Sequence, residues 1–275
     1  MTVKNTIAGK ESFESPTFAN RIKSMLKLDF YRLFHTPAFY IMLVVAAIIP
    51  AMVLALSVAD TASPTSNSAY TQNTSQVEMP VYDNTWQLIE STGGSAVADN
   101  PMDFAGFANI NMLFIFAGLL MAIFVAHDYD SGFVKNIFTV HSKKMDYVIS
   151  KTAIGVFGGT GMIITYVLGT VLAGLISGKA FDVNLSGLIL CLLSKAFLMG
   201  VFCSLFLGIA VFFRNKLWLT ISFTFLLGMM FYPAASVATL SSTVLTVLLS
   251  LTGGAVGVFV FGTVSSLILR KRDLA

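Results

Sequence analysis

Three ionisable side chains stand close together in the sequence and are the first candidates for chemistry. His127, Asp128 and Asp130 follow an apolar run and precede a polar loop. Imidazole and carboxylate groups can hold a metal ion or transfer a proton. Their position at the end of a hydrophobic segment, where Asp130 or Ser131 can begin a new helix, favours helix capping over a metal site.

The sequence lacks the patterns of the common catalytic sites. It has no phosphate-binding G-x-x-x-x-G-K-[ST] loop, no H-E-x-x-H, no G-x-S-x-G and no Cys/His cluster with metal-ligand spacing. Cys191 and Cys203 fall on one predicted helix, and about 18 Å of helix rise between them prevents a disulfide. We therefore expect no catalytic residue, bound metal or bound cofactor, and a need for energy from outside the chain.

Four residues inside apolar runs are candidates for a transport pathway or a substrate contact: Asn109, Asn111, Lys195 and Pro233. Polar groups within a membrane span usually face protein or a water-filled cavity. The Lys195 side chain has two structural alternatives, a partner in another helix or an outward reach to the lipid headgroups. Pro233 removes a backbone donor, and we expect the helix to break there into a short outer hairpin.

The composition is that of a polytopic membrane protein. Of 275 residues, 56% are hydrophobic and 11% are charged. A bilayer core of about 30 Å needs roughly 20 apolar residues per helix. Six runs meet or approach this length, and they predict an all-α domain over residues 38–269. They cover roughly 38–59, 104–126, 152–177, 187–213, 217–232 and 243–269, the fifth being the shortest.

Lysine and arginine are distributed unequally between the connecting segments. The segment 60–103 contains neither residue, whereas basic side chains precede the first run and follow the second, fourth and sixth. Because positive charge stays on the cytoplasmic side, both termini are predicted to be cytoplasmic and 60–103 external. The protein is placed in a bacterial plasma membrane. Its net charge of +3 then reflects topology, not binding to nucleic acid.

The chain before the first span divides into a mobile tail, residues 1–19, and an amphipathic helix, residues 20–37. The apolar stripe of this helix consists of Ile22, Met25, Leu26, Phe30 and Leu33. Basic side chains on both flanks predict that it lies on the inner surface of the membrane. Asp29 falls within the stripe; it is expected to pair with Arg32 or to contact the spans. Residues 270–275 form a basic cytoplasmic tail.

The segment 127–151 is predicted to be a cytoplasmic loop with a short helix of its own. Phe133, Val134, Ile137 and Phe138 share one face of that helix, and Lys135 lies at its edge. An isolated short helix is marginal in water and needs a partner or the headgroup region. A simple interfacial loop that anchors two spans is the alternative.

Two stretches resemble the permease subunits of type-2 ATP-binding-cassette exporters. LKLDFYRLFHTPAFYI is similar to the cytoplasmic entry helix of that family, and DYDSGFVKNIFTVHSKKMDYVISK to its first internal loop. The positions that carry the second similarity are Asp130, Gly132, Lys135, Ser142, Tyr147 and Lys151. The resemblance implies a coupling helix that binds a separate ATPase carrying ATP and magnesium. It also implies six spans, an outer hairpin between spans five and six, and a second permease subunit, here a second copy of this chain.

Two functions follow as hypotheses. The first is the permease of an ATP-driven exporter, whose ATPase-coupling residues are Phe133, Val134, Lys135, Ile137 and Phe138. Its phenylalanine-rich interior, with few charges, suggests an amphipathic or hydrophobic cargo such as an antimicrobial peptide or toxin. The second is a membrane-embedded sensor or scaffold whose external segment binds a ligand and whose internal loop signals to a partner. An ion-coupled transporter is disfavoured, since Lys195 is the one ionisable group deep in a predicted span.

Overall fold

The computed structural model describes residues 17–62, 84–89, 109–139, 143–214 and 216–271. This part of the chain contains eight α-helices and a short 3-10 helix, η1. The helices are α1 (Phe18–Phe34), α2 (Pro37–Ala62), η1 (Thr85–Leu88), α5 (Met112–Asp130), α6 (Phe133–Thr139), α7 (Lys144–Ser177), α8 (Leu185–Phe213), α9 (Leu217–Ala235) and α10 (Val244–Lys271). The described residues thus confirm the all-α fold class. Both predicted tails lie largely outside them, since residues 1–16 and 272–275 are not described.

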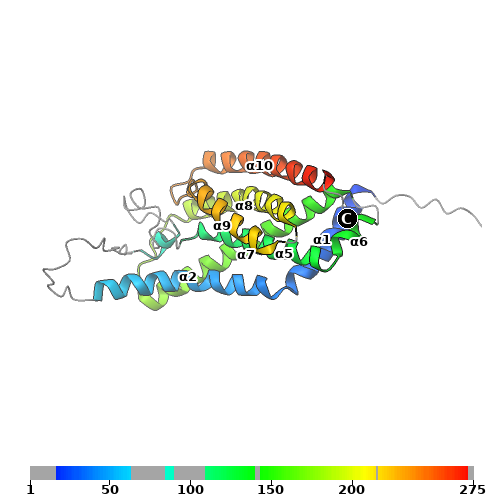
Figure 1. Cartoon of the computed structure of the whole chain (residues 1–275). Helices are drawn as coiled ribbons and strands as arrows, with labels where there is room; N and C mark the ends of the chain where they lie inside the picture. Colours follow the sequence, from blue (N-terminus) through cyan, green and yellow to red (C-terminus); the bar gives the residue numbers. More distant parts are fainter. Residues whose placement is uncertain (1–16, 63–83, 90–108, 140–142, 215, 272–275) are drawn as a thin grey trace, which may run out of the picture.

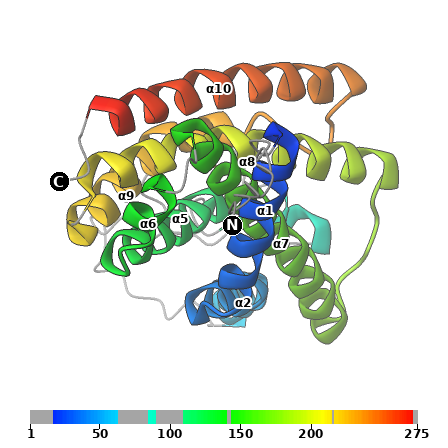
Figure 2. The ribbon, with the colours of Figure 1, turned by 90° about the vertical axis from the view of Figure 1, so that its right-hand side faces the viewer.

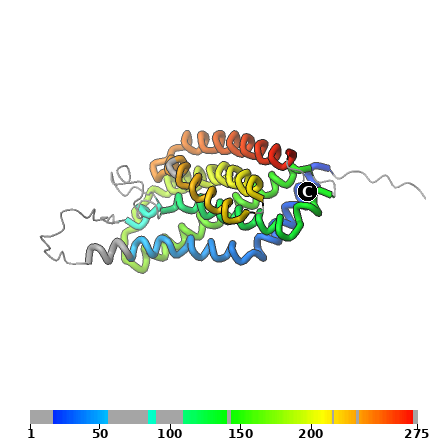
Figure 3. The backbone as a smooth tube through the Cα atoms, viewed as in Figure 1, coloured from blue at the N-terminus to red at the C-terminus, as the bar shows by residue number. Residues whose placement is uncertain are grey.

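The long helices form an elongated bundle whose two ends differ (Figure 1). At one end, α1 and α6 lie beside the end of α10, and the exposed basic residues Lys143, Lys216, Arg270 and Lys271 occur there. We call it the basic end. The tube view shows η1 and the α9–α10 connection at the opposite end (Figure 3). Figure 2 looks along the bundle and shows α1 crossing it near α7, with α10 on the far side from α2.

Five described helices are long and apolar enough to cross a membrane: α2, α5, α7, α8 and α10. The apolar stretch of α9, Leu217–Phe231, is shorter than these five. The outer face of α10 exposes large side chains, including Leu248, Val256, Phe259 and Val264, as expected where lipid replaces water. The multi-pass architecture is therefore established, while the sixth span stays a prediction.

Two helices extend further into the predicted internal loop than the sequence suggested. α5 continues to Asp130 and α7 begins at Lys144, so that only residues 131–143 connect them, with α6 in between. The reason is that Asp128 and Lys151 are fully buried and paired inside the bundle. A helical backbone holds such side chains in place while satisfying its own polar groups.

The expected break at Pro233 is wrong. α9 continues through this residue and ends at Ala235, and residues 236–243 form turns rather than a hairpin with helical arms. A side chain holds the turn, since the Thr239 backbone N–H donates to the Ser242 hydroxyl at 3.0 Å. The proline lies in the last turn of the helix, so little helix remains beyond it to be disrupted.

Glycines allow α7 to approach several neighbours closely. Gly155 and Gly159 lie against Met121, Cys203 and Met199 of the same chain. Gly169 is tighter still, because a Cβ atom there would lie 2.2 Å from the backbone oxygen of Ala47 on α2. Only a residue without a side chain permits this distance between the two helices.

We predict that Gly169→Ala destabilises the bundle by about 1–3 kcal/mol, because the α2 backbone must move to admit the methyl group. Thermal unfolding of the purified protein in detergent measures the change. Gly161→Ala on the same helix is the control, since its Cβ would meet Leu43 at an ordinary 3.7 Å. Equal unfolding temperatures for the two variants would contradict the close contact.

Candidate functional site

The apolar stripe of α1 packs onto the bundle, and the charged residues Asp29 and Arg32 of this helix also face inward. Met25 and Leu33 are buried, and Leu26 and Phe30 are half-buried against the core. Asp29 shares this face and is 1% exposed. The helix predicted over residues 20–37 is therefore present as α1, although its position at the membrane surface stays a prediction.

Four charged side chains from three helices meet at the basic end, and we call them the ion-pair cluster: Asp29, Arg32, Asp128 and Lys151. The Lys151 ammonium lies 2.7 Å from Asp29 Oδ1 and 2.6 Å from Asp128 Oδ2. Arg32 Nη1 lies 2.5 Å from Asp128 Oδ1, a charge contact rather than an aligned hydrogen bond. The cluster balances two carboxylates with two cations, as buried charges require.

This pairing corrects the expected local contact between Asp29 and Arg32. Asp29 is bound instead by Lys151 and by the Ser150 hydroxyl, which donates at 2.6 Å. The Tyr147 hydroxyl donates to Asp128 at 3.0 Å. All of these contacts join α1 or α5 to α7. Of the two expected alternatives for Asp29, the structure has the contact with the spans.

A second ion pair joins α1 to α7, closer to the first residues of both helices than the ion-pair cluster is. Arg21 Nε lies 2.8 Å from Asp146 Oδ2. Eight residues separate Arg21 from Asp29, which corresponds to about 12 Å along α1. α1 is therefore fixed to α7 at two positions, and this limits its freedom to swing away from the bundle.

Aromatic rings close the ion-pair cluster on two sides. The Phe133 ring of α6 lies 4.0 Å from the Arg32 guanidinium carbon, and the Phe124 ring of α5 lies 4.1 Å from the Lys151 nitrogen. Such cation–π contacts contribute about 0.5–2 kcal/mol, more when water is excluded. α6 thus contacts the cluster directly through its first residue.

The apolar face of α6 is turned toward its own bundle. Val134 is 1% exposed and packs with Tyr147 and other buried residues of α5, α7 and α8. Ile137 and Phe138 are half-buried against the same group. Val134 is therefore taken up by its own bundle, whereas Phe133, Ile137 and Phe138 keep part of their surface exposed, and the expectation that this face enters a groove of a partner stays a prediction. The physical reason for the packing is that the open surface at the ends of α5 and α7 already offers these side chains an apolar site.

The polar face of α6 points to solvent. Lys135, Asn136 and Thr139 are exposed, as is Ser131 just before the helix. The most exposed surface of α6 therefore consists of Lys135 and its polar neighbours, with Phe133 and Phe138 half-buried beside it.

Near the opposite end, Lys195 joins three helices through a separate polar contact. Its ammonium donates to Asn111 Oδ1 at 2.6 Å and to the backbone oxygen of Ala235 at 3.2 Å. Asn109 Oδ1 accepts from the Asn111 backbone N–H at 2.8 Å, and both asparagines precede α5 rather than lying within it. Ala235 ends α9, where a cation stabilises the unpaired carbonyls of the last turn.

This contact brings together three of the four residues that the sequence proposed for a pathway. Asn109, Asn111 and Lys195 are each buried to 3% exposure or less. Pro233 lies two residues before the Ala235 carbonyl that Lys195 binds. Between the two alternatives for Lys195, the described residues show a structural partner rather than an outward reach to lipid.

The first candidates for chemistry are separated by the fold. Asp128 is buried in the cluster, whereas His127 and Asp130 are exposed at the end of α5. Ser131 is the C-cap of α5, and its hydroxyl donates to the His127 carbonyl at 2.7 Å; a cap by Asp130 or Ser131 at the start of α6 stays a prediction. Within the described ranges, no group of three His, Cys, Asp or Glu residues is arranged to hold a metal ion.

Apolar helices in one bundle, with a charged and partly helical cap at one end, define a multi-pass membrane protein. A sequence model of the family described as "ABC-2 family transporter protein" matches residues 25–231, from α1 into α9. Because this match covers most of the chain, the protein belongs to that family, and the similarity to type-2 exporter permeases is confirmed at this level. No curated protein and no solved structure matched the chain.

Two members of the site were not singled out by their chemistry: Asp146 and Lys151. Lys151 directly precedes an apolar run, and Asp146 lies five residues before Lys151 in the polar segment. A charge in such a position is equally typical of a solvated helix end and of a headgroup anchor. One feature of the sequence does indicate this pairing: acidic and basic residues flank several apolar runs on the predicted cytoplasmic side, where they can pair with one another.

We predict that Lys151→Met destabilises the protein by about 3–5 kcal/mol, because buried Asp29 would keep only the Ser150 hydroxyl and no cation, and Asp128 would keep only Arg32 as its cation. Adding Asp29→Leu restores the charge balance and should recover part of the loss. Thermal unfolding of the single and double variants in detergent measures both effects. Lys27→Met, at an exposed position of α1, is the control; a Lys151 variant as stable as this control would refute the cluster's role.

Proposed function

We propose that this protein is the permease half of an ATP-driven exporter. Its family consists of membrane subunits of ABC transporters, which implies an ABC ATPase as partner. The cofactors ATP and magnesium then belong to that ATPase. The observation that carries the proposal is the packing of α6 on the bundle: Val134 is buried, and half-buried Phe133 connects this otherwise polar helix to the ion-pair cluster.

The basic end is the cytoplasmic side in this proposal. The Lys and Arg residues at the ends of α7, α8 and α10 gather there, and positive charge favours the cytoplasmic face. The proposal is thus a chain with cytoplasmic termini in a bacterial plasma membrane. This orientation also exposes α6 to the compartment in which ATP is available.

Force from the ATPase would enter through the polar face of α6. The helix has seven residues, and it rests on α5 and α7 through its opposite face. Phe133 contacts Arg32, and Arg32 contacts Asp128, which in turn binds Lys151. A displacement of α6 therefore acts on α1, α5 and α7 together.

The pathway residues lie at the other end of the bundle. Lys195 closes α8 onto the start of α5 and the end of α9. Opening of the transporter to the outside would break this contact, so that Asn109, Asn111 and Lys195 would face the cargo. An amphipathic or hydrophobic molecule, such as an antimicrobial peptide or toxin, fits the apolar interior. A second copy of the chain would supply the other half of the pathway.

We predict that Lys135→Glu abolishes co-purification with the ATPase, since it reverses the charge of the exposed face of α6 without touching the buried face. The measurement is the amount of ATPase retained by the tagged permease. Lys216→Glu is the matched control, as it changes an exposed lysine of the other connection at the basic end. If only the Lys216→Glu control loses the ATPase, or if both variants retain it, the docking surface lies elsewhere.

A different outcome is expected for Phe133→Leu. Removal of the ring weakens the contact with Arg32 by about 0.5–2 kcal/mol but leaves the polar face unchanged. The ATPase should remain bound, while cargo-stimulated ATP hydrolysis falls severalfold in reconstituted vesicles. Unchanged stimulation would show that Phe133 does not transmit the movement.

A further inference from the structure

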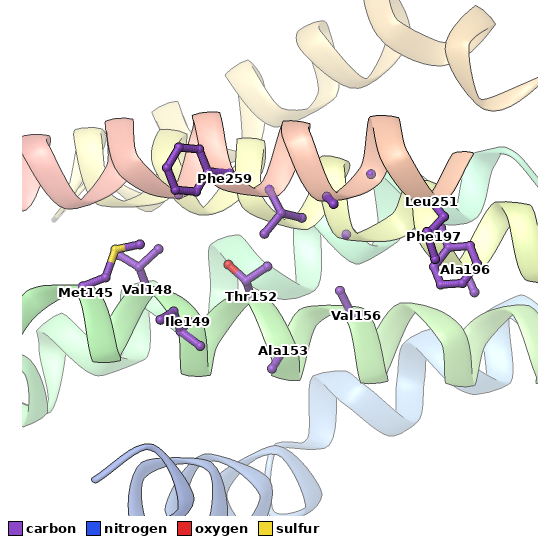
Figure 4. A pocket seen from close by; sticks show the side chains of 15 residues that line it. Met145, Val148, Ile149, Thr152, Ala153, Val156, Ala196, Phe197, Leu251 and Phe259 are labelled. Carbon is purple, nitrogen blue, oxygen red and sulfur yellow. The ribbon is translucent and has the colours of Figure 1, made fainter. Parts of the chain in front are cut away.

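An apolar groove of about 660 Å³ lies between α7, α8 and α10 (Figure 4). Its floor includes Val148 and Gly200, and its open edge consists of Ala153, Ala255 and Phe259, which are exposed. The groove therefore opens on the surface of the bundle, between two helices that are long enough to span a membrane. The proposed cargo pathway at Lys195 does not use it.

The length and depth of the groove match one leaflet of a bilayer. Along α7 its wall runs from Met145, beside the basic end, to Val156. The eleven steps from Met145 to Val156 correspond to about 16 Å of helix, close to half of a hydrocarbon core of about 30 Å. A molecule that fills the groove from the basic end therefore reaches about the middle of the membrane, as an acyl chain does.

Basic side chains stand at the mouth of the groove. Lys144 precedes Met145, and its ammonium donates to the backbone oxygen of Leu269 at 2.7 Å, which holds it beside the end of α10. Arg270 is exposed and follows Phe259 by eleven residues, about three helical turns, so it lies on the groove side of α10. Their charge complements an anionic headgroup.

Thr152 carries the one hydroxyl on the groove wall. It is 6% exposed, and its oxygen has no hydrogen-bond partner among the described residues. Figure 4 shows this oxygen on the groove side of α7. A threonine in a helix can turn its hydroxyl to a carbonyl of the preceding turn, so a hydrocarbon occupant leaves no obligatory polar group unsatisfied. A peptide occupant, by contrast, would offer Thr152 a carbonyl.

We infer that the α7–α8–α10 groove binds an acyl chain of an acidic phospholipid, with the lipid's phosphate held between Lys144 and Arg270. The lipid comes from the cytoplasmic leaflet, which rests on the orientation proposed above. A bound chain fills the space between α7 and α10 and holds the two helices at their observed separation. The acidic headgroup ties the end of α10 to the start of α7.

The test uses the purified full-length chain without the ATPase, exchanged in detergent with equal amounts of phosphatidylglycerol and phosphatidylcholine that carry the same acyl chains. Native mass spectrometry then measures the retained lipid. The wild-type chain should retain phosphatidylglycerol preferentially. Arg270→Gln and Lys144→Gln should each lower that retention about fivefold and leave phosphatidylcholine unchanged. Neither ATPase docking nor membrane orientation affects this result.

Matched variants separate the groove from the surrounding surface. Gly262→Leu fills the groove, where a Cβ would meet only Val148 at 3.7 Å, whereas Gly253→Leu adds the same bulk to open space on the same helix. Only the first should reduce lipid retention. Lys271→Gln changes the residue after Arg270, turned by about 100° around the helix, and should have no effect. If the two glycine variants, or the Arg270 and Lys271 variants, lower lipid retention equally, the assignment is overturned.

Two further results would contradict the assignment. Retention of phosphatidylglycerol that falls on Thr152→Val would show that a polar part of the lipid, and not its hydrocarbon chain, lies against this wall, and it would overturn the acyl-chain assignment. Equal retention of both lipids by the wild-type chain would exclude recognition of the headgroup. If Gly262→Leu fails to fold, a phosphatidylglycerol with a photoreactive acyl chain should label the Ala153 or Ala255 segment of the wild-type chain. Labelling confined to other surfaces would refute the site.

Discussion

The arrangement at the basic end depends on one buried ammonium group. Lys151 is fully buried and touches two carboxylates, one from α1 and one from α5. A buried lysine without these partners would be costly, and so would either carboxylate without the lysine. The three helices therefore have to meet at this point for any of them to be stable. Arg32 completes the charge balance and brings the aromatic ring of α6 into the same assembly.

The same constraint bears on the short internal helix. A seven-residue helix is too short to be stable alone, and its apolar residues find an apolar site at the ends of α5 and α7. In the proposed function, stability and partner binding therefore use opposite faces of α6. The buried face makes α6 part of the permease, and the polar face remains available to a second protein. A flexible loop with exposed phenylalanines could transmit little force, whereas a helix packed against the bundle can transmit it to the spans.

The sequence predicted most of the helices because the lengths of apolar runs and the charges between them are local properties. α8 and α10 begin and end within about two residues of their runs, in line with the usual uncertainty of helix ends. Pairing between distant residues is different. Asp29 was noticed because it interrupts an apolar stripe, yet its partners lie more than a hundred positions away. Spacing within α1 favoured Arg32, three residues on, and nothing local distinguishes that choice from Lys151.

Lys195, like Lys151, fixes helices to one another through buried polar contacts, and the positions of these contacts indicate how the molecule can change shape. Polar contacts tie the helices together at both ends, through Lys151 and through Lys195. Between these ends, the walls of the groove shared by α7, α8 and α10 are almost entirely apolar. Apolar contacts have no preferred direction, so they permit small sliding movements that a buried ion pair resists. Changes in shape should therefore be easiest along the middle of the bundle, with the ion-pair cluster at the basic end moving as a unit.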